Sequence, residues 1–171
     1  MSDRQTDISE HTLSAIEGIG WPAVPGREGA SLLAVLFQLE QSQWWPAAKL
    51  RAHQLGQIER LCNFARQHNP YVKQRLDAAG ITENETLSDE AWQRLPVLTR
   101  DELQKAGSKL QCKELPKAHG RTNQSTTTGS TGKPVSVRRT ELSAFYWTAF
   151  TLRDHMWRKR DLSATFATIR Y

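Results

Sequence analysis

The apolar residues in the first two thirds of the chain recur at the spacing of amphipathic helices. Residues 1–30 lack this spacing and contain several Gly and Pro residues, so we expect a flexible tail there. From Ser31 onward the pattern becomes helical, with apolar residues spaced i, i+3, i+4 and i+7. These residues are Leu32, Val35, Leu36 and Leu39.

Proline and glycine residues divide the next stretch into two helices. Pro46 suits the first turn of a helix, and the apolar spacing continues until Asn69 and Pro70, which should end it. A shorter helix is expected over residues 71–79, closed by Gly80.

Residues 81–89 have the composition of a loop, and the next structural signal is a capping box. In the Thr-Arg-Asp-Glu sequence that starts at Thr99, the Thr99 hydroxyl can accept a hydrogen bond from the Glu102 amide, while the Glu102 carboxylate accepts one from the Thr99 amide. Pro96 supports a helix that begins just downstream. The cap needs only a structural role, and we expect residues 31–115 to form a helical N-terminal region.

After Pro116 the pattern changes from helical spacing to alternation. Residues 124–134 are a run rich in Ser, Thr and Gly, and residues 135–138 alternate like a strand. Thr140 can cap a further helix, and residues 163–171 alternate again as a strand. The apolar residues of that helix are Leu142, Phe145, Ala149, Leu152 and Met156.

This order of elements predicts an α/β fold. Helices come first, and a strand, a loop, a strand, a helix and a strand follow. Two or three strands with one helix cannot cover both faces of an α/β sheet. We therefore expect residues 116–171 to be the beginning of a larger α/β domain, so that the chain is an N-terminal fragment truncated within that domain.

The distribution of charge points to an anionic partner. The net charge is +5, and residues 1–48 hold two basic and six acidic side chains, so the basic excess lies downstream of them. Such an excess suits a polyanion, which could be a nucleic acid, a nucleoside triphosphate or an anionic surface.

Composition also excludes several protein classes. No apolar run approaches the roughly 18 residues that a membrane span needs. Residues 1–11 are polar and acidic, unlike a secretory signal, and we expect Cys62 and Cys112 to be reduced thiols of a cytoplasmic protein. The five His residues show no metal-ligand spacing. A membrane protein, a disulfide-rich secreted protein and a zinc finger are therefore not expected.

The Ser/Thr/Gly run has the chemistry of an anion-binding loop. Its hydroxyls donate hydrogen bonds, its glycines let backbone amides approach an anion closely, and Lys133 adds a positive charge. The candidate phosphate-binding residues are Thr127, Thr128, Gly129, Ser130, Thr131, Gly132 and Lys133. The run is not a P-loop, because Thr127 stands where that motif needs Gly, and Pro134 where it needs Ser or Thr. The spacing of its glycines also excludes the dinucleotide-binding fingerprint.

The order Thr-Thr-Gly-Ser-Thr-Gly-Lys-Pro, at residues 127–134, closely resembles the phosphate-binding signature of adenylate-forming enzymes, the acyl-CoA synthetase superfamily. Val135 stands where many members have Lys, a departure familiar in the phenylacetate–CoA ligase-like branch. Residues 51–80, with their Asn-Pro-Tyr turn, and residues 95–103 also resemble the N-terminal helices of that branch. Val72 replaces the usual second Tyr of the turn.

The resemblance implies an ATP-dependent ligation in two steps. A carboxylic acid, an aryl acid in much of this branch, attacks the α-phosphate of ATP, and coenzyme A then takes the acyl group from the adenylate. The loop would hold the β- and γ-phosphates through the hydroxyls or amides of residues 127, 128, 130 and 131, through backbone access at the two glycines, and through the charge of Lys133. The family's motifs for Mg2+, for the ribose and for the catalytic Lys would lie beyond position 171. The resemblance therefore assigns no catalytic residue and no metal ligand to this chain, which we expect to be inactive alone.

Two other functions stay open. One is a catalytically inactive interaction protein that keeps the front half of a ligase fold. The other is a basic nucleic-acid-binding module, for which Arg158-Lys159-Arg160 is a candidate; these charges are better explained by the dipole of the preceding helix, so we expect neither nucleic acid nor a membrane as partner. Arg138 and Arg139 could extend the anion-binding site, although arginines at strand ends are more often solvated. A homodimer is one option for the oligomeric state.

Overall fold

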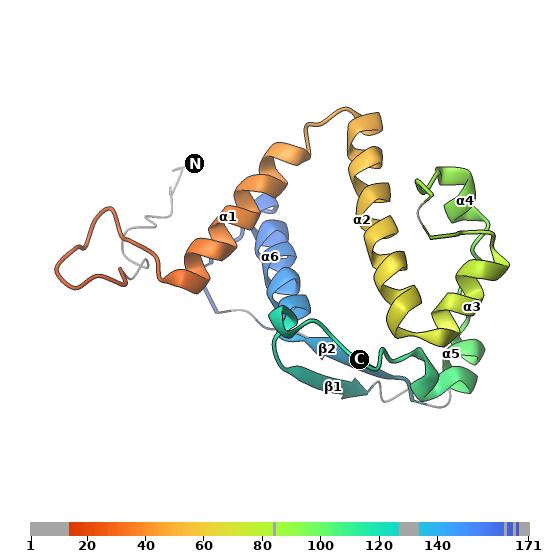
Figure 1. The fold of residues 1–171 in the computed structure, drawn as a ribbon. Helices are drawn as coiled ribbons and strands as arrows, with labels where there is room; N and C mark the ends of the chain where they lie inside the picture. Colours follow the sequence, from red (N-terminus) through yellow and green to blue (C-terminus); the bar gives the residue numbers. More distant parts are fainter. Residues whose placement is uncertain (1–13, 84, 127–133, 163, 166, 168–171) are drawn as a thin grey trace. The chain divides into compact units, whose positions relative to one another are not determined.

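The computed structural model describes residues 14–83, 85–126, 134–162, 164–165 and 167 (Figure 1). Of these, 58% are helical, and they also form a two-stranded antiparallel sheet. Contacts divide the chain into two units, Trp44–Ala144 and a second unit that joins Met1–Gln43 to Phe145–Tyr171. The expected mixture of helix and sheet is present, whereas the larger α/β domain remains a prediction.

In the unit that joins both ends of the chain, helix α1 (Arg27–Ser42) begins upstream of the expected Ser31. Glu28 lies in its first turn, where a negative charge interacts favourably with the helix dipole. A hydrogen bond joins the two ends of the segment 14–24, which precedes the helix. The Ser14 hydroxyl accepts it from the Val24 amide at 3.2 Å. The helix predicted from the apolar spacing is therefore confirmed, and it extends into the segment expected to be a tail.

Helix α6 (Glu141–Trp157) has the cap predicted for it. The Ser143 amide donates to Thr140 Oγ1 at 3.1 Å, and the Thr140 amide donates to Ser143 Oγ at 3.0 Å. In the stretch expected to be a final strand, Ala164, Thr165 and Ala167 are not in a strand. The other residues of 163–171 lie outside the described part of the chain.

In the unit Trp44–Ala144, helices α2 (Ala47–His68) and α3 (Pro70–Ala78) meet at Asn69. The Asn69 amide donates to the Ala65 carbonyl at 2.8 Å, and Asn69 Oδ1 accepts from the Val72 amide at 3.0 Å. The residue is completely buried, and the proline after it brings no N–H to the first turn of α3. One asparagine thus terminates α2 and caps α3, which confirms the predicted break.

The core of this unit lies where α2 and α3 face the segment that follows them. Its buried apolar residues are Cys62, Leu76, Ala79, Ile81 and Leu87. The chain leaves α3 through Gly80, whose φ of +69° favours glycine, as the sequence predicts. Arg66 is also buried, and its guanidinium donates to the Asp77 carboxylate and to the Ile81 carbonyl. Two nitrogens of this buried guanidinium are therefore hydrogen-bonded, while its Nε is buried without a partner among the described residues.

Helix α4 (Asp89–Gln93) was not expected from the sequence. It is capped by Ser88, whose hydroxyl accepts from the Ala91 amide at 3.1 Å. Because the helix is barely more than one turn long, apolar periodicity could not reveal it.

Helix α5 (Arg100–Ala106) carries the complete capping box. The Glu102 amide donates to Thr99 Oγ1 at 3.2 Å, and the Thr99 amide donates to Glu102 Oε2 at 2.8 Å. Two 3-10 turns follow, η2 (Gly107–Leu110) and η3 (Lys117–His119). No helix in the described residues has both the length and the apolar character that crossing a membrane requires.

Candidate functional site

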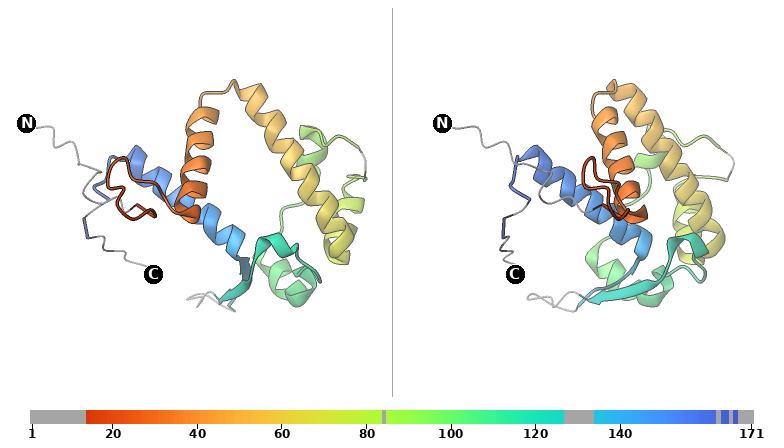
Figure 2. Two further views of the ribbon diagram at one scale, coloured as in Figure 1. Left: turned by 60° about the vertical axis from the view of Figure 1, so that its left-hand side comes forward. Right: turned by 90° about the vertical axis from the view of Figure 1, so that its left-hand side faces the viewer.

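A β-hairpin carries the predicted phosphate-binding loop. Strands β1 (Thr122–Thr126) and β2 (Ser136–Thr140) pair antiparallel, with Thr126 opposite Ser136 and Thr122 opposite Thr140. The strands lie side by side in every view (Figure 2). The start of the run, expected to be loop from residue 124, is therefore strand as far as Thr126, because each residue of β1 has a partner on β2.

The seven predicted site residues, Thr127, Thr128, Gly129, Ser130, Thr131, Gly132 and Lys133, lie outside the described residues. The structure describes the chain on both sides of them, up to Thr126 and again from Pro134. At the end of the hairpin, Thr126 Oγ1 and Ser136 Oγ lie 2.8 Å apart and share a hydrogen bond. This pair ties the two ends of the connection to each other and adds two exposed hydroxyls beside it.

The two faces of the hairpin carry different side chains. Cross-strand partners share a face, so Arg138 lies with Gln124 on one face, and Arg139 lies with Asn123 on the other. Arg138 Nη2 donates to the Cys112 carbonyl at 2.8 Å and anchors this face to the segment after η2. The two arginines therefore do not form a single cationic extension of the loop.

The other end of the hairpin is fixed by an ion pair. Arg121 Nε lies 2.9 Å from Glu141 Oε1, and this interaction lowers the pKa of the Glu141 carboxyl. Gly120 has a φ of +72°, and a Cβ built on it would lie only 2.8 Å from the Cβ of Glu141. Only glycine suits this turn, which leads the chain from η3 into β1.

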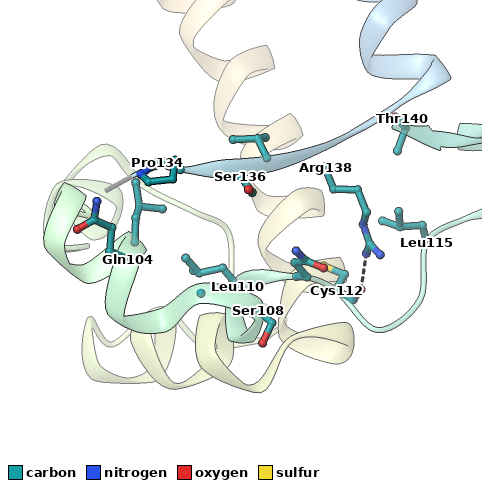
Figure 3. A pocket seen from close by; sticks show the side chains of 14 residues that line it. Gln104, Ser108, Leu110, Cys112, Leu115, Pro134, Ser136, Arg138 and Thr140 are labelled. Atoms are coloured by element: carbon teal, nitrogen blue, oxygen red, sulfur yellow. Dashed lines mark hydrogen bonds between the residues drawn. The ribbon is translucent and has the colours of Figure 1, made fainter. Parts of the chain in front are cut away.

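A cavity of about 560 Å³ lies between β2 and the segment formed by α5, η2 and the residues after them (Figure 3). Pro134 and Val135, which directly follow the predicted loop, belong to its lining. Most of the lining surface is apolar, and Arg138 enters it from β2. Sequence reasoning missed this cavity because it assigned residues 103–115 only a structural role.

The two cysteines lie in different environments. Cys62 is buried in the core beside α3, and burial raises the pKa of its thiol. Cys112 is half-buried and lines the cavity. Neither forms a disulfide in the structure, which agrees with the expectation of free thiols.

Two residues of the basic cluster Arg158-Lys159-Arg160, which follows α6, pair with a carboxylate of that helix. Arg158 Nε lies 2.9 Å from Asp154 Oδ1, and Arg160 Nη1 lies 3.5 Å from Asp154 Oδ2. These arginines also lower the pKa of Asp154. Part of the charge proposed for nucleic-acid binding is therefore compensated by a neighbouring carboxylate. Among the described residues, no group of three or more His, Cys, Asp or Glu side chains could hold a metal ion.

Comparisons of the chain with protein-family models, with curated proteins and with solved structures gave no match. The functional interpretation therefore depends on the residues of the loop and on the hairpin that carries it.

Proposed function

We propose that this chain is the N-terminal part of an ATP-dependent carboxylic acid–CoA ligase of the adenylate-forming type, and that residues 127–133 bind the phosphates of ATP. The observation that carries the proposal is the pairing of Thr126 with Ser136. This pairing makes the Ser/Thr/Gly run the connection of a β-hairpin. A Ser/Thr/Gly run without such flanks is usually a flexible linker.

The hairpin also supports this type of loop over a P-loop. A P-loop connects a strand to a helix, so its amides point along a helix axis. Here the run connects two antiparallel strands, and helix α6 begins only after β2. The anion would accordingly be held by the hydroxyls and amides of the connection and by Lys133.

In the proposed reaction, the loop acts on the leaving group. A substrate carboxylate attacks the α-phosphorus of ATP, the bond to the bridging oxygen of pyrophosphate breaks, and an acyl-adenylate forms. Negative charge increases on the pyrophosphate as it leaves, and the donors of residues 127–133 would stabilise that charge. A thiol, coenzyme A in this proposal, then attacks the acyl carbon and releases AMP. The acid remains defined only as a carboxylic acid, with an aryl acid as the first choice.

A second candidate, an interaction protein with a ligase-like front half, is favoured by a different observation. The unit that joins both ends of the chain exposes large apolar side chains on both its helices. They include Leu33 and Phe37 on α1 and Trp147, Phe150 and Trp157 on α6. Exposed apolar groups in such numbers are typical of surfaces that bind another protein.

Carboxylate-dependent exchange of pyrophosphate into ATP by the complete natural protein separates these two candidates. We expect exchange that requires both the acid and ATP. Lys133→Ala and Gly132→Val should each lower kcat/KM for ATP by about tenfold or more, because each removes a donor or the close approach of the backbone. Lys117→Ala, an exposed lysine of η3, is the matched control and should leave exchange unchanged.

The possible results have distinct meanings. Unchanged kinetics in both loop variants would rule out the assignment of the loop. Absence of exchange with every acid tested, in protein that still folds, would favour the interaction protein.

A further inference from the structure

The cavity beside β2 combines an aliphatic wall with a single cation. Leu103, Leu110 and Leu115 line it from the segment opposite β2, and Pro134 and Val135, just before β2, also belong to its lining. Among the described residues that line the cavity, the one charged side chain is that of Arg138, and the lining contains no carboxylate. In Figure 3 the Arg138 side chain extends from β2 toward the segment at Cys112 and Leu115.

Arg138 is held in this position by the backbone opposite it. Its Nη2 donates to the Cys112 carbonyl at 2.8 Å, which uses one of the five N–H donors of a guanidinium. The planar group can therefore hold this carbonyl and a carboxylate together. The Arg138 side chain is exposed, so a carboxylate can reach its guanidinium from solvent.

We propose that this cavity binds a small amphipathic carboxylic acid, with its carboxylate on Arg138 and its apolar body against the leucine side chains. The volume of about 560 Å³ lies within the range of roughly 300–1,000 Å³ of small-molecule sites. An aryl or branched alkyl body fits such a wall. The proposal uses none of residues 127–133, and its test is carried out without ATP, so it can fail or hold separately from the proposed function.

Binding in the cavity can be measured through the rate at which Cys112 is chemically modified. The chain contains two cysteines, of which Cys112 lines the cavity and Cys62 is buried in the core. A maleimide should therefore modify Cys112 first, and mass spectrometry of the peptides separates the two rates. The probe is 3-phenylpropionate, compared with its neutral amide, 3-phenylpropionamide, and with acetate, which has almost no apolar body.

We expect saturating 3-phenylpropionate to slow modification of Cys112 about fivefold or more, with half-protection in the millimolar range expected for a ligand of this size. The rate at Cys62 should stay constant. The amide lacks the carboxylate, and acetate lacks the apolar body. Each should therefore give less than about twofold protection at the same concentration.

Two arginines on the same strand give a matched pair of variants. Arg138→Met should raise the concentration for half-protection by about tenfold, because the charge-assisted hydrogen bonds are lost. Arg139→Met removes the same charge from the other face of the hairpin and should change that concentration by less than about twofold. The Cys62 rate reports whether each variant keeps its core closed.

Three results would overturn the proposal. These are absence of protection by 3-phenylpropionate, equal protection by the amide, and equal losses in the two arginine variants. If Arg138→Met exposes Cys62, the comparison of acid and amide on the unchanged chain still decides the matter.

Discussion

The two units of this protein use their apolar residues in opposite ways. In Trp44–Ala144, the core cluster between α2 and the segment after α3 also encloses Asn69 and Arg66, both hydrogen-bonded. In the unit that joins the chain ends, the buried apolar residues are Leu36 and Ala149, as far as the described residues show. Trp147 in the same helix as Ala149 is 67% exposed.

The comparison teaches that amphipathic spacing identifies the covered side of a helix and leaves the amount of burial open. In helix α1 the four residues of the predicted stripe are half-buried, or buried in the case of Leu36, whereas Leu33 and Phe37 lie outside the stripe and are exposed. Helix α2 has a weaker apolar pattern, but it lies against α3 and the residues that follow. Its Cys62 is buried there, and Leu55 and Ile58 pack against the same core cluster. Burial here depends on which elements follow along the chain, and less on the strength of the pattern.

The largest change in the free energy of unfolding is expected from truncating a core leucine of the unit Trp44–Ala144. Leu76 is 1% exposed, and Leu76→Ala should lower the free energy of unfolding by about 3 kcal/mol through lost burial and a cavity. Leu61→Ala in α2, where the side chain is 64% exposed, is the matched control and should cost less than about 0.5 kcal/mol. Urea unfolding followed by circular dichroism measures both. Similar losses in the two variants would contradict the proposed location of the core.

A smaller effect is expected from acid. Hydrogen bonds from Lys73 and Arg66 lower the pKa of Asp77 below its usual value of 3.8. A carboxyl whose pKa is lower in the folded state stabilises the fold above the unfolded pKa, and this stabilisation is lost as the pH falls through the folded pKa. The pKa is also lowered, in the same unit, for Asp89, Glu90, Glu102 and Glu141.

Asp77→Asn should therefore lower the urea midpoint at pH 7 and should make that midpoint less sensitive to acid between about pH 5 and pH 3. Asp101→Asn, an exposed carboxylate of α5, serves as the control. If the two variants respond to pH in the same way, the contacts of Asp77 do not contribute to stability as described.

The smallest effect on stability is expected on the exposed surface of α6. Trp147→Ser should change the free energy of unfolding by less than about 0.5 kcal/mol, while reducing the binding of an apolar fluorescent dye. Its neighbour Ala149 is completely buried, and Ala149→Leu should cost about 1–3 kcal/mol because the site has no room for the larger side chain. A large loss in Trp147→Ser would mean that this unit has a core that includes Trp147.

The parts of the fold that the sequence predicts are those determined by neighbouring residues. The break at Asn69, the capping box at Thr99 and the cap at Thr140 depend on side chains that bond to their own backbone a few residues away. Helix α4 was missed because one turn is too short for a periodic pattern, although Ser88 offered the signal of an N-cap.

The site divides in the same way. Alternation predicted the second flank of the hairpin, whereas residues 124–126 of the first flank were expected to be loop. The chemistry of the loop was predicted from its residue types, and it stays a prediction because residues 127–133 lie outside the described part of the chain. The cavity could not be predicted, because it forms only when β2 lies against α5 and η2. The bond from Arg138 to the Cys112 carbonyl joins residues far apart in sequence, and neither residue type alone indicates it.

The joint at Asn69 has a consequence for the order of folding. Because one residue provides the end of α2 and the start of α3, neither end is complete until both helices exist, so the two should form as one cooperative step. The core that packs on them is built from residues between Leu55 and Leu95, all close in sequence. Contacts of such short range form fast, and on a ribosome this region could close soon after it emerges, ahead of the hairpin and of α6.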